Sequence, residues 1–158
     1  MSVRPLIIDP SLCFIEGAWV ACESGDTLPL GNPSDGSILC EIARGGPADV
    51  DRAVAAAEVS LQGQWGRATA AERGRLLARI GQLVLENAEE LARLEAMDVG
   101  KPLTQARNDV TALARYMEFY GGAADKVHGA TIPYLDGYTV YTLREPHGVT
   151  GHIIPWNY

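Results

Sequence analysis

The sequence predicts an α/β fold in which β-rich segments flank a helical middle. The first forty-odd residues carry strand and turn signals, four segments between residues 47 and 127 have helical spacing, and an alternating pattern returns after Gly129. A chain of 158 residues has room for about one domain. Hydrophobic residues make up 47% of it, but 21 of them are alanine, so bulky core-forming side chains are fewer than that share suggests.

Two β signals occupy the N-terminal part. Residues Phe14 to Val20 predict two short strands around the turn pair Glu16-Gly17. A further strand is expected from Ser37 to Ile42, after the turn-forming run at residues 32–36 (Asn-Pro-Ser-Asp-Gly).

The first two predicted helices each have a recognisable start. Pro47 suits the first turn of a helix, and apolar residues follow it at i, i+3, i+4 and i+7 spacing. The run Thr69-Ala70-Ala71-Glu72 has the form of a capping box. Behind this box, a buried stripe is expected from Leu76, Leu77, Ile80, Leu83 and Val84.

The third and fourth helices follow directly. Asn87, with Glu90 three residues later, predicts the start of the third, and Gly100 with Pro102 predicts its end. The fourth carries Val110, Leu113, Ala114 and Met117 at helical spacing. The pair Gly121-Gly122 is expected to end or kink it.

The C-terminal part returns to β structure. Residues 131–135 and 138–144 flank Asp136-Gly137, which predicts a hairpin whose two turn residues both take positive φ. Residues 148–154 predict a strand buried on both faces, as in a parallel sheet, and Pro155 ends it. A parallel neighbour requires a crossover of a dozen or more residues, so we expect the partners of this strand to lie outside the sequence, leaving the fold incomplete on its own.

Composition excludes several classes of function. With 13 Lys and Arg against 20 Asp and Glu, the net charge is -7, and no basic cluster is present, so nucleic acid is not an expected partner. Three cysteines, none in a C-x-x-C pair, favour a reduced, intracellular protein. No apolar run approaches the roughly 18 residues of a membrane span. A cytoplasmic protein is expected, with no membrane partner.

The remaining candidates for catalytic or ligand-binding residues lie at the C-terminal end of the sequence. Neither a G-x-G-x-x-G nor a G-x-x-x-x-G-K-[ST] loop is present, and the histidines and cysteines lack metal-ligand spacing, so no metal site is predicted. The run Ile153-Ile154-Pro155-Trp156-Asn157 follows the carboxyl end of the predicted strand, where open α/β sheets bind ligands. The amide of Asn157 could donate to a developing oxyanion, or the run could only turn the chain, and the residues alone leave both open.

The C-terminal run, residues 144–158, resembles the start of the cofactor-binding core of the NAD(P)-dependent aldehyde dehydrogenase superfamily. The resemblance spans nearly the whole chain, because four other segments match family motifs and occur in the same order as in the family. They are Phe14-Ile15-x-Gly17-x-Trp19, Asn32-Pro33-x-x-Gly36, Asp98-x-Gly100-Lys101-Pro102, and Tyr116 through Gly121-Gly122 to Ile132-Pro133.

This resemblance implies three parts. Residues 1–130 would be the N-terminal strand-and-helix part of the cofactor-binding domain, residues 131–146 an oligomerisation hairpin, and residues 147–158 the first strand and loop of a Rossmann-like core. The chain would then be the N-terminal portion of a subunit that forms a homo-oligomer, either a dimer or a tetramer.

The resemblance also implies an activity and its residues. Family members oxidise an aldehyde to a carboxylic acid with NAD or NADP, through a cysteine thiohemiacetal and thioester that a glutamate base helps to hydrolyse. Asn157 would hold the oxyanion, and Ile153, Ile154, Pro155 and Trp156 would touch the nicotinamide-ribose half of the cofactor. Asp98 and the backbone near Leu30 align with a structural monovalent-cation site of some members.

The departures from the family pattern concern activity. The catalytic cysteine, the glutamate and the pyrophosphate-binding turn of the family lie downstream of the residues present here, so the 158-residue chain is expected to be inactive alone. Cys13, Cys22 and Cys40 align with nothing catalytic. His147 and His152 replace residues that are usual in the family. A non-catalytic oligomerisation module derived from the family is the alternative function, and a stand-alone nucleotide-binding domain is a third.

Overall fold

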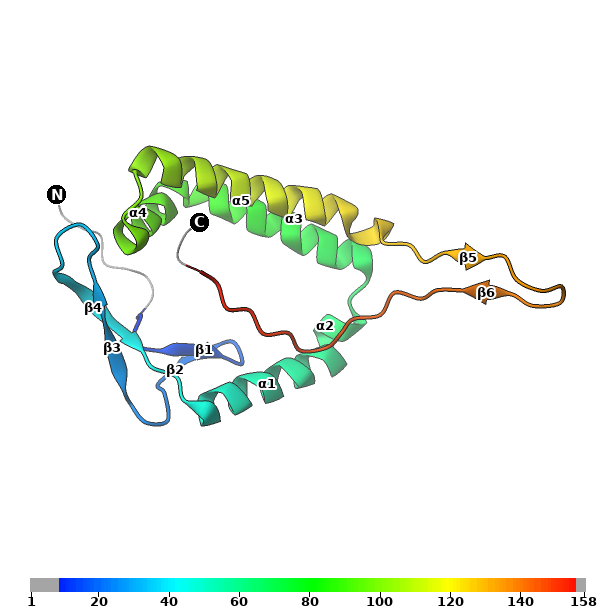
Figure 1. The fold of residues 1–158 in the computed structure, drawn as a ribbon, viewed down its shortest axis with the longest axis horizontal. Coiled ribbons are helices and arrows are strands. Elements are labelled where there is room, and N and C mark those ends of the chain that lie inside the picture. The colour runs from blue at the N-terminus through cyan, green and yellow to red at the C-terminus, as the bar shows by residue number, and fades with distance from the viewer. Residues whose placement is uncertain (1–8, 156–158) are drawn as a thin grey trace. The chain divides into compact units, whose positions relative to one another are not determined.

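The computed structural model describes residues 9–155, and these form two compact units (Figure 1). The first unit comprises the chain up to residue 66 with residues 97–100, and the second comprises residues 67–96 with the chain from residue 101. The elements are β1 (Cys13–Ile15), β2 (Ala18–Val20), β3 (Thr27–Gly31), β4 (Ile38–Ala43), α1 (Pro47–Gln62), α2 (Gln64–Arg67), α3 (Ala70–Glu86), α4 (Ala88–Val99), α5 (Leu103–Ala123), the 3₁₀ turn η1 (Ala124–Lys126), β5 (Thr131–Ile132) and β6 (Val140–Tyr141).

The first hairpin forms as predicted. Strands β1 and β2 are antiparallel, with Phe14 opposite Trp19, and their rings lie 4.9 Å apart between centroids. The two turn residues both have positive φ, 55° at Glu16 and 76° at Gly17. A two-residue turn of this kind matches the twist of the strands that it joins, which explains why so short a hairpin forms.

The second hairpin contains a strand that the sequence interpretation missed. β3 pairs with the predicted strand β4, and a bulge interrupts the register between Leu30 and Gly31. Pro29 lies within β3, opposite Glu41. Proline is tolerated there because the ribbon has only two strands, so each has a free edge. The alternation of Leu28 and Leu30 was the available signal, and the intervening proline concealed it.

The four predicted helices are all present, as α1, α3, α4 and α5, and the four-residue α2 was not predicted. Pro47 is the first residue of α1. At the start of α3 the capping box is complete: the Glu72 amide donates to Thr69 Oγ1 at 3.2 Å, and the Thr69 amide donates to Glu72 Oε2 at 2.7 Å. Two orphan amide groups are thereby satisfied.

The buried face of α3 differs from the predicted stripe. Leu76, Ile80 and Leu83 are exposed, and the fully buried residues of α3 are Gly74 and Gly81. Leu77 and Val84, which were also predicted, are half-buried. Two glycines seven residues apart lie on one face of a helix, so the close neighbour of α3 packs along this glycine line. Hydrophobicity alone could not indicate that face.

That neighbour is α5, and its glycine pair has a role other than the predicted one. The helix continues through Gly121 and Gly122 to Ala123. A Cβ added at Gly121 would lie 2.8 Å from the carbonyl oxygen of Gly74, and one added at Gly74 would lie 2.4 Å from that of Gly121. The absence of side chains at these two positions therefore allows the backbones of α3 and α5 to touch.

The two ends of α4 differ in how well they match the prediction: the start differs from it and the end agrees with it. Asn87 does not cap α4 with its side chain; its Nδ2 donates instead to the Leu83 carbonyl at 2.8 Å and so closes α3. At the other end, Gly100 has φ +72° and Pro102 precedes α5, as predicted. The core of the second unit joins α3, α4 and α5, and Ala92, Ala106 and Val110 are its buried members.

The C-terminal hairpin forms with shorter strands than predicted. Thr131 pairs with Tyr141 and Ile132 with Val140. Gly137 has φ +83°, but Asp136 does not have positive φ, so the expected turn with two positive φ values is wrong. The Tyr138 amide donates to the Leu135 carbonyl at 3.2 Å, which closes the turn. Pro133 lacks an amide proton and cannot extend the ladder.

The predicted strand at residues 148–154 is not formed as a strand in this structure. The segment makes no ladder within the described residues, and Ile153 and Ile154 are 100% and 79% exposed instead of buried on both faces. A strand acquires its hydrogen bonds only from a neighbour, so this outcome follows where no partner strand is present. Within residues 9–155, none of the helices is both long and apolar enough to cross a membrane.

Candidate functional site

The predicted cofactor-binding residues form an exposed apolar surface. Ile153, Ile154 and Pro155 follow one another in extended, unpaired chain, and all three are exposed. Trp156 and Asn157 lie outside the described residues, so the predicted oxyanion donor has no structural account here. Within the described residues, the site therefore consists of one apolar strip.

This strip is predicted to contact one part of a nicotinamide cofactor. Exposed aliphatic side chains on an extended backbone could lie against the nicotinamide-ribose half, where ligand pockets are commonly lined by apolar groups. The family's pyrophosphate-binding turn is not part of this sequence. Contact of Ile153, Ile154 and Pro155 with a cofactor therefore stays a prediction.

The two residues aligned with a cation site lie in the same unit. Gly100, two residues after Asp98, packs against Pro33, three residues after Leu30: a Cβ at Gly100 would lie 3.0 Å from Pro33 Cγ. Asp98 is exposed and Leu30 is half-buried. Their role in binding a cation stays a prediction.

The histidines do not gather into a site. His152 Nε2 lies 3.1 Å from Thr150 Oγ1, a local contact on exposed chain. Among residues 9–155, no three His, Cys, Asp or Glu side chains are grouped so that they could hold a metal ion.

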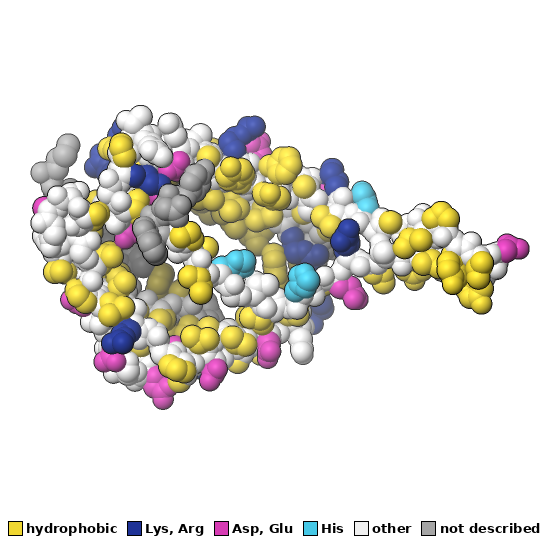
Figure 2. Space-filling view, viewed as in Figure 1, with side chains coloured by type: hydrophobic (Ala, Val, Ile, Leu, Met, Phe, Trp, Pro, Cys, Tyr) yellow, Lys and Arg dark blue, Asp and Glu magenta, His cyan; other side chains and the backbone are white. Residues whose placement is uncertain are grey.

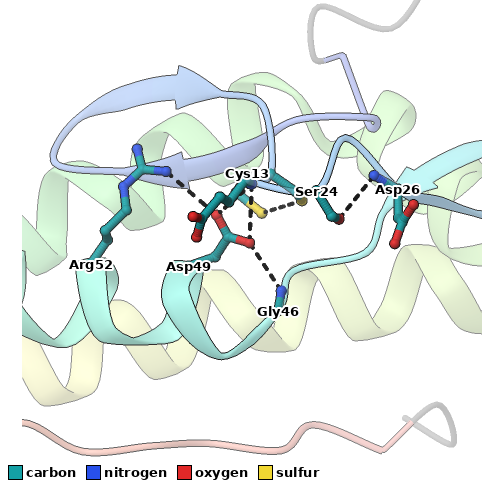
Figure 3. A network of polar contacts seen from close by, with 8 residues as sticks. Cys13, Ser24, Asp26, Gly46, Asp49 and Arg52 are labelled. Carbon is teal, nitrogen blue, oxygen red and sulfur yellow. Dashed lines mark hydrogen bonds and ion pairs between the residues drawn. The ribbon is translucent and has the colours of Figure 1, made fainter.

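Asp49 is the most buried charged residue of the described chain, and the sequence interpretation did not single it out (Figure 3). It is 4% exposed and lies in the first turn of α1. Its Oδ2 accepts from the Gly46 amide at 3.0 Å and its Oδ1 accepts from the Glu23 amide at 3.1 Å. Arg52 Nη1 lies 3.4 Å from Oδ1. The sequence feature that could have indicated this role is the acidic residue three positions after Gly46, in the first turn of the helix that Pro47 begins.

This carboxylate joins the chain after β2 to the start of α1. The hydrogen bonds from Gly46 and Glu23 and the charge of Arg52 outweigh its burial and hold the pKa of Asp49 below the ordinary value of 3.8. An ionised carboxylate that accepts from amides at a helix start also complements the helix dipole. Asp49 is thus a structural anchor of the first unit.

Cys13 and Cys22 lie next to this anchor. Their sulfur atoms are 3.5 Å apart, Cys22 is 5% exposed, and Cys13 is half-buried. Cys40, like Cys13, is half-buried, so Cys22 is the one buried cysteine of the three. The hydrogen bond with Cys13, burial, and nearby negative charge that includes Asp49 raise the pKa of Cys22.

Lys101 carries the most enclosed ion pair of the second unit. Its Nζ lies 2.7 Å from Glu95 Oε1 and 2.7 Å from Asp109 Oδ2, and its side chain is 10% exposed. These contacts with Asp109 and Glu95 raise the pKa of Lys101. Since Glu95 belongs to α4 and Asp109 to α5, the lysine connects the two helices at their junction.

Glu89 lies on the exposed surface of α4, in its first turn. Arg107 contacts both of its oxygens, at 2.8 and 2.9 Å, and Arg93 contacts it at 3.0 Å. The hydrogen bonds from Arg107 and Arg93 lower the pKa of Glu89 to about 2. The Glu89 side chain is 49% exposed, so this network is screened by solvent.

We expect Glu89→Gln to lower Tm by no more than a few degrees, because exposed ion pairs are weak. The folded-state pKa is depressed, so the stabilisation is present above the ordinary value of 4.5 and is lost as pH falls from there towards about 2. Thermal melts across that range should show the difference between variant and parent shrinking with acid. Glu90→Gln is the matched control, and an equal loss in both variants would contradict the assignment.

A shallow depression of about 390 Å³ lies between the first hairpin and α1. Its lining is mainly small and apolar, with Ile15, Ala18, Val20 and Val59 among the residues, and Glu16 and Arg52 at its edge. No titratable cluster faces it, so the depression offers volume without evident chemistry.

The chain belongs to the aldehyde dehydrogenase family, whose pattern it matches over residues 19–158. This confirms the resemblance inferred from the motifs, and the fold agrees with it. The chain corresponds to the N-terminal portion of an aldehyde dehydrogenase subunit.

Individual relatives support the assignment. Hydroxyisobutyraldehyde dehydrogenase of Mycolicibacterium austroafricanum is 49% identical over 94% of this chain and 29% of its own length. A solved structure from Burkholderia cenocepacia, assigned as an aldehyde dehydrogenase, is 59% identical, with a TM-score of 0.89 over 92% of this chain and 31% of that one. PnpE, solved in complex with nicotinamide adenine dinucleotide, is 39% identical, with a TM-score of 0.79 over 84% of this chain and 27% of its own. The chain thus spans about three tenths of the length of these relatives.

Proposed function

We propose that this chain supplies the N-terminal part of an NAD(P)-dependent aldehyde dehydrogenase that oxidises an aldehyde to a carboxylic acid. The observation that carries this proposal is the family match over residues 19–158. The reaction would use a cysteine thiolate and a glutamate base that the family carries downstream of these residues. The chain by itself would therefore be inactive.

Within that enzyme, the described residues would serve binding. Residues 147–158 would form the first strand and loop of a Rossmann-like core, with Ile153, Ile154, Pro155 and Trp156 against the nicotinamide-ribose half of NAD or NADP. The cofactor, when bound, accepts hydride from the substrate. Exposure of Ile153 and Ile154 supports this role, because a contiguous exposed apolar run is typical of a surface that a ligand or a neighbouring strand covers.

Asn157 would donate its side-chain amide to the oxyanion of the tetrahedral intermediate. Loss of such a donor costs roughly 100- to 1000-fold in kcat in a well-studied case. The same magnitude is expected here for Asn157→Ala.

A chimera tests the proposal. The matched region of the Mycolicibacterium austroafricanum enzyme would be replaced by this chain, and formation of reduced nicotinamide followed with an aldehyde that the relative oxidises. We expect turnover from the chimera and none from the chain alone. In the chimera, Asn157→Ala should lower kcat roughly 100- to 1000-fold. Asn108→Ala, at an exposed position of α5, should leave kcat unchanged. Turnover by the chain alone, or an unchanged kcat in the Asn157 variant, would refute the proposed roles.

Oligomerisation is a second proposed role, for residues 131–146. The hairpin exposes large apolar side chains along its length (Figure 2): Tyr134, Leu135, Tyr138, Tyr141 and Leu143 are each at least 60% exposed. A two-stranded ribbon with two free edges is marginal by itself and gains by pairing with further strands. These features support a homo-oligomer, and they also suit the alternative of a non-catalytic oligomerisation module. The proposed assembly is a dimer or tetramer, and its proposed location is the cytoplasm.

A further inference from the structure

Two of the three thiols of the chain are placed as a pair. Cys13 begins β1, opposite Val20 in the ladder, and Cys22 follows two residues after Val20. The hairpin therefore brings the two sulfur atoms to 3.5 Å. A disulfide bond is about 2.05 Å long, so the sulfur atoms need to approach by roughly 1.5 Å, which side-chain rotation about Cβ can supply.

The pair is distinct from the third cysteine. Cys40 lies on β4, and across residues 9–155 its sulfur contacts neither of the other two. Cys13 is half-buried and thus open to a small solute, whereas Cys22 is 5% exposed behind it. The arrangement separates an accessible thiol from a buried one within contact distance.

We infer that Cys13 and Cys22 form a redox-active pair that closes to an intramolecular disulfide when the protein meets a peroxide. The Cys13 thiolate attacks one peroxide oxygen, the O–O bond breaks, and a sulfenic acid and one water result. The Cys22 sulfur then attacks the Cys13 sulfur, the S–O bond breaks, and the displaced hydroxide takes a proton to form a second water. Overall two thiols lose two electrons and two protons, and one hydrogen peroxide is reduced to two waters.

The surroundings favour this order of events. The hydrogen bond with Cys13, burial and nearby negative charge raise the pKa of Cys22 and so favour its protonated form, and a thiol is a poor nucleophile until it ionises. Cys13 is therefore the first to react and Cys22 the resolving thiol. Direct contact between the two makes the second step faster than further oxidation of Cys13 by peroxide.

The disulfide would join the start of β1 to the chain just after β2. Glu23, next to Cys22, donates its amide to Asp49, and Gly45, next to the capping residue Gly46, lies near the Cys13 sulfur: a Cβ there would be 3.7 Å from it. A bond between the two cysteines would thus fix the hairpin end that lies beside the contacts at the start of α1 (Figure 3). The oxidised protein is expected to melt at a higher temperature than the reduced one.

Thiol titration and peptide mapping test the inference. The reduced chain would be treated with hydrogen peroxide under native conditions, and its free thiols counted after denaturation. Cleavage after glutamate separates the three cysteines, because Glu16, Glu23 and Glu41 place them on residues 1–16, 17–23 and 24–41. We expect three thiols to fall to one, a cross-link between the first two peptides, and restoration by a dithiol reductant.

Matched variants make the result decisive. Cys40→Ser should form the same cross-link, whereas Cys13→Ser and Cys22→Ser should not, and in Cys22→Ser peroxide should leave Cys13 as a trappable sulfenic acid. Retention of three thiols, a cross-link that includes Cys40, a bond between two chains, or oxidation of Cys13 beyond the sulfenic acid while Cys22 is present would each overturn the inference. Far-ultraviolet circular dichroism confirms that each variant is folded as the parent is.

Discussion

Replacing Gly74 by alanine should be among the most damaging single-methyl changes in this chain, with an expected loss of about 1 to 3 kcal/mol in the free energy of unfolding. The new Cβ would lie 2.4 Å from the Gly121 carbonyl oxygen, a distance that forces α3 and α5 apart. The obstacle is helix backbone on both sides, so no flexible side chain can move aside. Alanine's better helix propensity, worth about 1 kcal/mol, offsets only part of this cost.

Gly122→Ala is the control that isolates the contact. Gly122 is next to Gly121 in α5, yet a Cβ there meets nothing within 4 Å. That variant should be neutral or slightly stabilising, for the same propensity reason. Denaturant unfolding of both variants measures the difference, and equal stability of Gly74→Ala and Gly122→Ala would show that the two helices do not depend on close approach.

Local signals in the sequence located the elements well. The Glu16-Gly17 pair predicted a hairpin, Thr69 and Glu72 predicted the start of α3, and Gly100 predicted the end of α4, because each feature acts within a few residues. Turn type was less certain: Asp136-Gly137 gives a turn, but only Gly137 has positive φ.

Faces and partners were harder to infer. The apolar stripe of α3 predicted burial of Leu76, Ile80 and Leu83, yet the face against α5 is set by glycines whose contribution is the absence of a side chain. Hydrophobic periodicity counts what is present and gives no weight to what is missing. In the same way, Asp49 appears in the sequence as one acid among 20 Asp and Glu, and only its fold reveals that amides converge on it.

The candidate site shows the same division. The motif at residues 153–157 could be recognised from its letters, because the order of residue types is specific to a family. Its geometry depends on strands and ligand that bring the extended segment into a sheet, and these are long-range interactions. Ile153 is fully exposed, so the segment carries the apolar side chains of the motif without the neighbouring strands that would cover them.

Asp49→Asn should destabilise the first unit through loss of the negative charge and of one hydrogen-bond acceptor. Asparagine has nearly the same shape, but its amide nitrogen cannot accept, so one of the two backbone amides, from Gly46 or Glu23, loses its partner. The remaining contact also becomes weaker, because it no longer involves an ion. We expect Tm to fall by about 5 °C or more at neutral pH.

The pH dependence identifies the cause. The folded-state pKa of Asp49 is depressed below 3.8, so its stabilisation is fully present above that value and is lost as pH falls through the lower folded-state pKa. The gap in Tm between parent and variant should therefore be constant from neutral pH down to about 5 and narrow below about 4. Asp51→Asn, at an exposed acid two positions further along α1, should show a much smaller gap. A gap for Asp49→Asn that persists unchanged into acid would mean that shape, and not charge, holds the start of α1 in place.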